Sequence, residues 1–91
     1  MGKETRLFKS EEPKLRADAA AFLHQIADKV AAGEVILRRG QEELTLNIPD
    51  NLVLEIQAED EDKKRKGIQH SLEIEIKWFD NDEISGPLEL G

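Results

Sequence analysis

Cysteine and tyrosine are absent from this 91-residue chain, and tryptophan and methionine occur once each. Without cysteine, the sequence excludes disulfides and metal sites built from thiolates. Its apolar runs are only a few residues long, far short of the ~20 that a membrane-spanning helix needs. Residues 1–6 lack the apolar stretch of a signal peptide, so we expect a soluble, cytoplasmic protein that does not bind membranes.

Acidic residues outnumber basic ones by 20 to 13, which gives a formal net charge of −7. Net repulsion of this sign disfavours non-specific binding to DNA, RNA or anionic lipid. A chain of this length is expected to fold as one domain, which we place at residues 1–79. Residues 80–91 have no sustained periodicity and are predicted to form a loose C-terminal tail.

Apolar and polar residues alternate strictly near the end of the predicted domain, a pattern typical of a half-buried β-strand. One face carries the apolar side chains Leu72, Ile74, Ile76 and Trp78. The other face carries Glu73, Glu75 and Lys77. The phase of Trp78 favours a buried position at the end of the core over an exposed platform for stacking.

A helical period occupies the first third of the chain. Apolar residues recur at spacings of three and four between Leu15 and Val30, which predicts an amphipathic helix rich in alanine. Pro13 suits the first turn of this helix, and Gly33 is expected to end it in the left-handed conformation. The preceding segment, Thr5–Lys9, is predicted to form a short first strand.

Period-2 segments follow Gly33, and they predict four antiparallel strands in a meander. If the apolar residues of the first two strands face inward, Arg38 lies opposite Glu43 and a turn remains at residues 39–42. The inward residues of this pair are Val35, Leu37, Leu44 and Leu46. Residues 49–51 suit a three-residue hairpin loop, and the charged run 60–67 is the expected loop before the last strand.

The predicted fold is therefore α+β, in the order β-α-β-β-β-β. Its one helix is expected to pack on one face of a mainly antiparallel sheet, and the other face is expected to be polar. The place of the first strand in that sheet stays open.

The order of these segments resembles the amphi-Trp domain family. The resemblance covers roughly residues 5–78, and four stretches carry it: residues 8–11, 19–23 and 26–33, and the alternating strand that closes on Trp78. It implies a domain of this type. It supplies no activity, substrate, cofactor or catalytic residue that could be transferred to this chain.

Residues suited to catalysis are few and show no catalytic spacing. His24 is predicted to be exposed on the helix, and His70 lies at the start of the last strand, on the same side as Leu72. No phosphate-binding glycine motif, nucleophile elbow or paired-histidine motif occurs. The acidic run at residues 80–83 does not fit an EF-hand loop. We therefore predict a non-enzymatic protein with no cofactor and no metal.

Two surfaces are candidates for interaction. The outward face of the predicted sheet carries Glu55, Glu73, Glu75 and Lys77, with Glu55 opposite either Glu73 or Glu75. The basic run Lys63, Lys64, Arg65 and Lys66 could contact nucleic acid or another anion, although it follows directly on four acidic residues. The leading hypothesis is a small module that binds a protein or peptide, or a second copy of itself, through a sheet edge or the acidic face.

Overall fold

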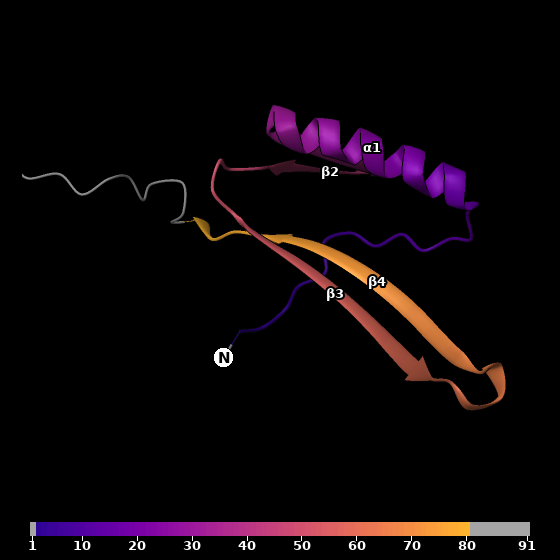
Figure 1. Cartoon of the computed structure of the whole chain (residues 1–91). Coiled ribbons are helices and arrows are strands. Elements are labelled where there is room, and N and C mark those ends of the chain that lie inside the picture. Colours follow the sequence, from indigo (N-terminus) through magenta and orange to yellow (C-terminus); the bar gives the residue numbers. More distant parts are fainter. Residues whose placement is uncertain (1, 81–91) are drawn as a thin grey trace, which may run out of the picture. The chain divides into compact units, whose positions relative to one another are not determined.

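A computed structural model describes residues 2–80 of the chain, so the predicted tail at residues 80–91 lies outside the described part except for Asp80. The chain divides into two compact units, Met1–Ile48 and Pro49–Gly91. Figure 1 shows the helix and strands of the chain, and within the described residues each unit contains one antiparallel strand pair. The elements are α1 (Arg16–Ala32), β1 (Glu34–Arg39), β2 (Glu42–Asn47), β3 (Val53–Asp62), the 3-10 turn η1 (Lys64–Lys66) and β4 (Ile68–Lys77).

Helix α1 begins later than the sequence predicts. It starts at Arg16, after an extended Leu15 that makes no side-chain cap, so the prediction that Pro13 lies in its first turn is wrong. The Leu15 carbonyl accepts the first helical hydrogen bond, from Ala19 N–H at 3.0 Å. The predicted end is confirmed: Gly33 has a φ of 89° and donates its N–H to the carbonyls of Lys29 and Val30.

The segment before the helix is not a strand. Thr5–Lys9 pairs with no other strand among the described residues, so the predicted first strand is wrong. Arg39 holds this segment instead. Its guanidinium lies 5.7 Å from the centre of the Phe8 ring, and its Nη1 donates to the Lys9 carbonyl at 2.8 Å.

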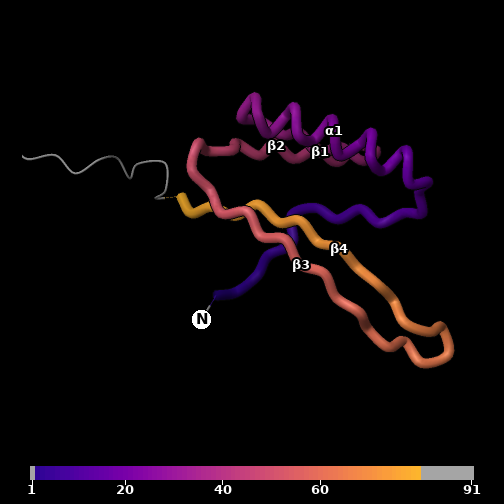
Figure 2. Tube along the Cα trace, in the orientation of Figure 1, coloured from indigo at the N-terminus to yellow at the C-terminus, as the bar shows by residue number. Residues whose placement is uncertain are grey.

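The β1–β2 hairpin confirms the predicted register. Val35 pairs with Leu46 and Leu37 with Leu44, and the Arg38 Nε donates to Glu43 across the strands at 2.7 Å. The strands run further than expected, so the turn contracts to residues 40 and 41, with Gly40 at a φ of 60°. Figure 2 shows α1 running along this hairpin, which it contacts through β1.

The core of the first unit lies between α1 and β1. Val35 is 7% exposed and is the one fully buried hydrophobic residue in the described part of the chain. Half-buried apolar side chains surround the same layer: Ala19, Ile26, Val30, Leu37, Leu44 and Leu46. One face of the helix and the inward face of the hairpin thus exclude water together.

The predicted four-strand meander is wrong, although the α+β class is confirmed. In the structure β1 pairs with β2 and β3 pairs with β4, which gives two separate two-stranded sheets. Residues 49–51 connect the two units and are not a hairpin loop. The Ile48 N–H bonds back to the Gly33 carbonyl at 2.9 Å, and Pro49 has no N–H, so the ladder of β2 ends here.

The β3–β4 hairpin is longer than the sequence predicts. Residues 60–62, expected in the loop, continue β3, because Asp60 pairs with His70 and Asp62 with Ile68. The Asp60 Oδ1 lies 2.6 Å from the His70 Nδ1. The remaining loop, Lys63–Gly67, is closed by a 2.8 Å hydrogen bond from the Lys63 N–H to the Gly67 carbonyl. We call this loop the tip, and the opposite end, at Val53 and Lys77, the base.

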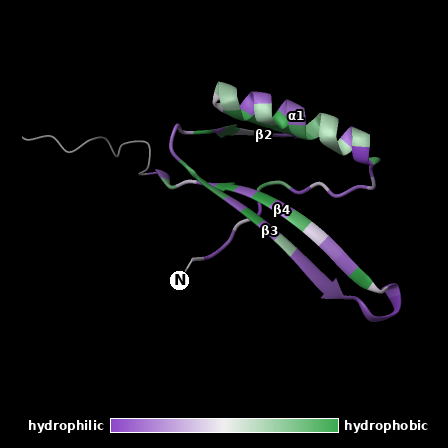
Figure 3. Ribbon diagram, in the orientation of Figure 1, coloured by the Kyte–Doolittle hydropathy of each residue, from purple (hydrophilic) through white to green (hydrophobic). Residues whose placement is uncertain are grey.

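The apolar face of this hairpin is exposed. It carries Leu54, Ile56, Ala58, Leu72, Ile74 and Ile76, and four of these are 54–70% exposed. The prediction that Leu72 and Ile74 are buried is therefore wrong for this structure, while Ile76 and Trp78 are half-buried. Figure 3 shows hydrophobic residues toward the base of the hairpin and hydrophilic ones along the tip half of β3. Alternation sorts side chains between two faces, but it does not say what covers either face.

Candidate functional site

Three glutamates and a lysine share the face of the β3–β4 hairpin opposite the apolar one. Glu55 pairs directly with Glu75, which confirms one of the two predicted registers, and Glu73 lies opposite Gln57. With Ile74, these residues line an open hollow of about 410 Å³. We call the surface formed by Glu55, Gln57, Glu73, Glu75 and Lys77 the acidic face.

Lys77 reduces the repulsion between the paired glutamates. Its Nζ lies 2.6 Å from the Glu55 Oε1 and 3.9 Å from the Glu75 Oε1. The hydrogen bond from Lys77, and then its charge, lower the pKa of Glu55, and the same contacts with Glu55 raise the pKa of Lys77. The alternation of the sequence places Lys77 on this face, but only the register of the hairpin shows which carboxylate it reaches.

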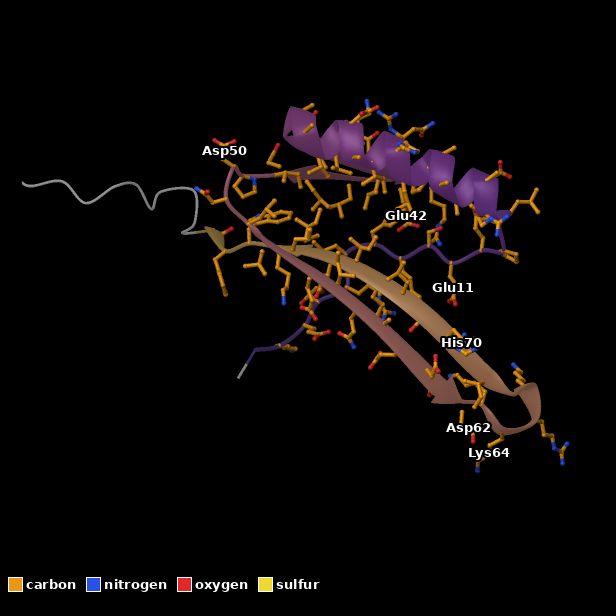
Figure 4. All side chains as sticks on the ribbon, in the orientation of Figure 1. Glu11, Glu42, Asp50, Asp62, Lys64 and His70 are labelled. Atoms are coloured by element: carbon orange, nitrogen blue, oxygen red, sulfur yellow. The ribbon has the colours of Figure 1, made fainter. Side chains whose placement is uncertain are left out.

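The candidate residues of the tip lie far along the hairpin from the acidic face. Lys63 pairs with Glu61 at 3.2 Å, whereas Lys64, Arg65 and Lys66 have no ion-pair partner among residues 2–80. Lys64 has a φ of 59°, and its N–H donates to the Asp62 Oδ1 at 2.8 Å. Figure 4 shows Asp62, Lys64 and His70 gathered at this end. The tip is thus a hydrogen-bonded turn with three cations that form no ion pair within the described part of the chain.

The two histidines differ in their surroundings. His24 is exposed on α1, as the sequence predicts. His70 contacts Asp60 across the hairpin, a pairing that the sequence pattern does not predict because it places Asp60 in the loop before the last strand. Within the described residues, no group of three histidine or carboxylate side chains could hold a metal ion. No helix in the same residues has the length and apolar character needed to cross a membrane.

Both edges of the β3–β4 hairpin pair with no other strand among the described residues. The Lys63–Gly67 hydrogen bond shows that odd-numbered residues bond across this hairpin, and the continuous register carries that alternation to the base. The N–H and carbonyl groups of even-numbered residues therefore point outward. Residues 54, 56, 58, 60 and 62 form the β3 edge, and residues 68, 70, 72, 74 and 76 form the β4 edge.

One comparison with known proteins gives a result. The family model described as the Amphi-Trp domain matches residues 1–90. No curated protein and no solved structure was found to match the chain. The match spans both units, and it includes the acidic face, the tip and the two edges.

Proposed function

Because the chain belongs to the Amphi-Trp domain family, we propose that this member is a non-enzymatic interaction module that binds another polypeptide. The binding surface is the β3–β4 hairpin, and binding occurs by addition of a strand to one of its edges. One observation carries the proposal. A ten-residue antiparallel pair has two edges whose backbone groups bond to no other strand among the described residues.

Strand addition would complete this hairpin. A two-stranded sheet is marginally stable in water by itself, and a third strand supplies hydrogen-bond partners for one whole edge. An added strand would also extend the apolar face, where Leu72 is 70% exposed and Ile56 is 64% exposed. Addition at an edge leaves the acidic face accessible to the partner. The negative charge of this face favours binding of a basic segment of the partner.

Proline substitution tests the proposal, because proline removes the N–H that an added strand would use. Leu72 and Ala58 are opposite each other, and their N–H groups point to the β4 and β3 edges respectively. We expect Leu72→Pro or Ala58→Pro to abolish capture of a partner protein from cell extract. Leu72→Ala, which keeps the N–H, should retain capture.

Amide exchange of the captured complex then locates the contact. The expected result is that the even-numbered amides of one edge exchange more slowly in the complex, while odd-numbered amides change little. A partner that protects only amides of residues 2–48, or that binds both proline variants as tightly as the parent chain, would refute strand addition.

A second candidate function rests on the three cations of the tip that have no ion-pair partner among residues 2–80. Lys64, Arg65 and Lys66 could contact the phosphates of a nucleic acid, in spite of the net charge of −7. Binding to single-stranded RNA should be measured at low salt, with the parent chain and with a variant carrying glutamine at residues 63–66. Absence of binding by the parent chain would dismiss this candidate.

A further inference from the structure

We propose that the strand added to this hairpin is β4 of a second copy of the chain, so that two hairpins form a four-stranded antiparallel sheet. This inference rests on the proposed function and names its partner. A two-fold axis would relate the copies, with strand order β3-β4-β4-β3.

The two strands differ in how strongly they oppose self-pairing. β3 carries five carboxylates in ten residues, and four of them are consecutive: Glu55, Glu59, Asp60, Glu61 and Asp62. Charged side chains on an edge strand discourage pairing with another copy, and like charges directly opposite destabilise the pair. β4 carries two glutamates, Glu73 and Glu75, together with Lys77. Its edge is therefore the one that accepts a second copy.

The pleat of the strand restricts the register. Residues opposite each other must lie on the same face of the sheet. An even-numbered residue must therefore lie opposite an even-numbered residue of the second copy, and an odd-numbered residue opposite an odd-numbered one. Two such registers give the greatest overlap of the ten-residue strand with its copy. One is centred on Leu72 and the other on Glu73.

Charge decides between these two registers. Centring on Leu72 places Ser71 opposite Glu73 of the second copy, and Gln69 opposite Glu75, so no glutamate faces another. Centring on Glu73 sets that carboxylate opposite its own copy, and like charges directly opposite each other destabilise the pair. In the first register, Leu72 lies opposite its own copy on the apolar face. His70 then lies opposite Ile74, and Ile68 opposite Ile76.

In the same arrangement, the tip of one hairpin and the base of the other carry complementary residues. Antiparallel copies place the tip of each hairpin beside the base of the other. The tip supplies Lys64, Arg65 and Lys66, which lack ion-pair partners among the described residues. The base supplies Asp80, which has no ion-pair partner in the same part of the chain, and Trp78, which lines an open hollow of about 560 Å³. Cations beside a carboxylate and an indole ring are stabilising neighbours.

The absence of native cysteine permits a direct test of the register. In the proposed sheet, residues 71 and 73 form a non-hydrogen-bonded pair, whose Cα atoms lie about 4.5 Å apart, within reach of a disulfide. Ser71→Cys and Glu73→Cys chains should be purified separately and oxidised alone and as a mixture. We expect the mixture to form covalent dimers roughly tenfold faster than either chain alone, because like positions lie beyond disulfide reach.

The alternatives give different products. Fast self-cross-linking of Glu73→Cys would indicate the register centred on Glu73 and would overturn the proposed pairing. Equal rates in all three samples would indicate random collision, which also overturns it. Sedimentation of the unsubstituted chain over a range of concentrations serves as a second measurement. A monomer at every concentration would overturn the inference whether or not the cysteine variants fold.

Failure of this inference is distinguishable from failure of the proposed function. The chain could be monomeric and still capture another protein, and Leu72→Pro or Ala58→Pro could abolish that capture. This result would support strand addition but would show that the added strand does not come from a second copy. If the dimer forms, Leu72→Pro should abolish it, whereas Ala58→Pro on the β3 edge should leave it intact. The reverse result would assign the contact to β3 and overturn the proposal.

Discussion

Both hairpins of this chain alternate apolar and polar residues, but their apolar side chains have different surroundings. In the first unit, α1 packs on β1, and Val35 on that strand is 7% exposed. In the second unit, which has only the short turn η1 as a helix among the described residues, Ile56 is 64% exposed. Alternation of apolar and polar residues therefore specifies a face that can be buried. A neighbouring element of matching apolar area decides whether burial takes place.

Because of this difference, we expect apolar side chains of the first unit to contribute to stability and those of the β3–β4 hairpin to contribute to binding. The hydrophobic contribution of the first unit comes from contacts already made between α1 and the β1–β2 hairpin. The apolar side chains of the β3–β4 hairpin retain most of their contact with water, so their hydrophobic contribution is still available to a partner. This contrast leads to predictions of unequal size for substitutions in the two units.

The largest expected effect is that of Val35→Ala. This substitution removes the equivalent of about two buried methylene groups and should lower the free energy of unfolding of the first unit by about 2 kcal/mol. Chemical denaturation followed by NMR signals of residues 2–48 measures it. Thr45→Ala, on the exposed face of β2, is the matched control and should change this value by less than about 0.5 kcal/mol. Similar values for the two variants would mean that the burial of Val35 does not stabilise the first unit.

The next effect concerns positive φ angles, which occur in both units. Gly33 has a φ of 89°, and a Cβ there would meet the Ile48 carbonyl at an ordinary 3.7 Å. Gly33→Ala should therefore destabilise the first unit through backbone strain alone, by roughly 1–2 kcal/mol. Hydrogen exchange of the amides near the end of α1 measures this cost. An unchanged exchange rate would mean that the left-handed cap is not needed there.

Lys64 offers the converse test in the second unit. It is a non-glycine residue with a φ of 59°, so Lys64→Gly should relieve strain in the tip. The expected stabilisation is below about 1 kcal/mol, because glycine also gains entropy in the unfolded chain. Exchange of the Gly67 amide, which donates to the Lys64 carbonyl, reports this change. Lys66→Gly serves as the control and should show no gain, since it removes a lysine without relieving a positive φ.

Exposure of the apolar face gives a smaller effect. Ile56→Thr keeps a β-branched side chain and changes a residue that is 64% exposed, so it should alter the stability of the second unit by less than about 0.5 kcal/mol. Val35→Thr is the matched substitution in the first unit. Its buried hydroxyl should cost roughly 1–3 kcal/mol. A loss above about 1 kcal/mol from Ile56→Thr would mean that this face is covered in solution.

Local sequence patterns predict the register within a hairpin well, but they predict neither which hairpins share a sheet nor which faces are buried. The register of β1 and β2 follows from which face is apolar, and the Arg38–Glu43 pair follows from that register. The predicted strand at Thr5–Lys9 was wrong because a strand needs a partner, and no local signal provides one. Asp60 was assigned to a loop from its composition. Its partner His70 becomes apparent only when the ladder is extended beyond the apolar residues.

The features of the candidate site likewise fall into those that the sequence predicts and those that require the structure. Alternation correctly placed Glu55, Glu73, Glu75 and Lys77 on one face, and the register identified the 2.6 Å contact between Lys77 and Glu55. The exposure of Leu72 could not be predicted, because it depends on elements distant in the sequence. The outward direction of the even-numbered backbone groups likewise required a hydrogen bond at the tip.

The smallest effect compares an exposed ion pair in each unit. Lys14 lowers the pKa of Glu12 across 2.8 Å, and Lys77 lowers the pKa of Glu55 across 2.6 Å. For a carboxylate with a lowered pKa, the stabilisation is complete above its ordinary pKa of about 4.3 and is lost as the pH falls through its pKa in the folded chain. For the lysine partners, whose pKa is raised, it is complete below about 10.4 and is lost at higher pH.

Carboxyl-carbon NMR titration separates the two pairs. Lys77→Met should raise the pKa of Glu55 toward its ordinary value and leave Glu12 unchanged, and Lys14→Met should do the reverse. Glu55 also faces Glu75, and a side-chain hydrogen bond with Glu75 is a further cause that lowers the pKa of Glu55, whereas Glu12 has no such second partner among the described residues. The rise should therefore be smaller for Glu55 than for Glu12. A rise at Glu55 as large as that at Glu12 would show that Glu75 does not contribute to the lowered pKa.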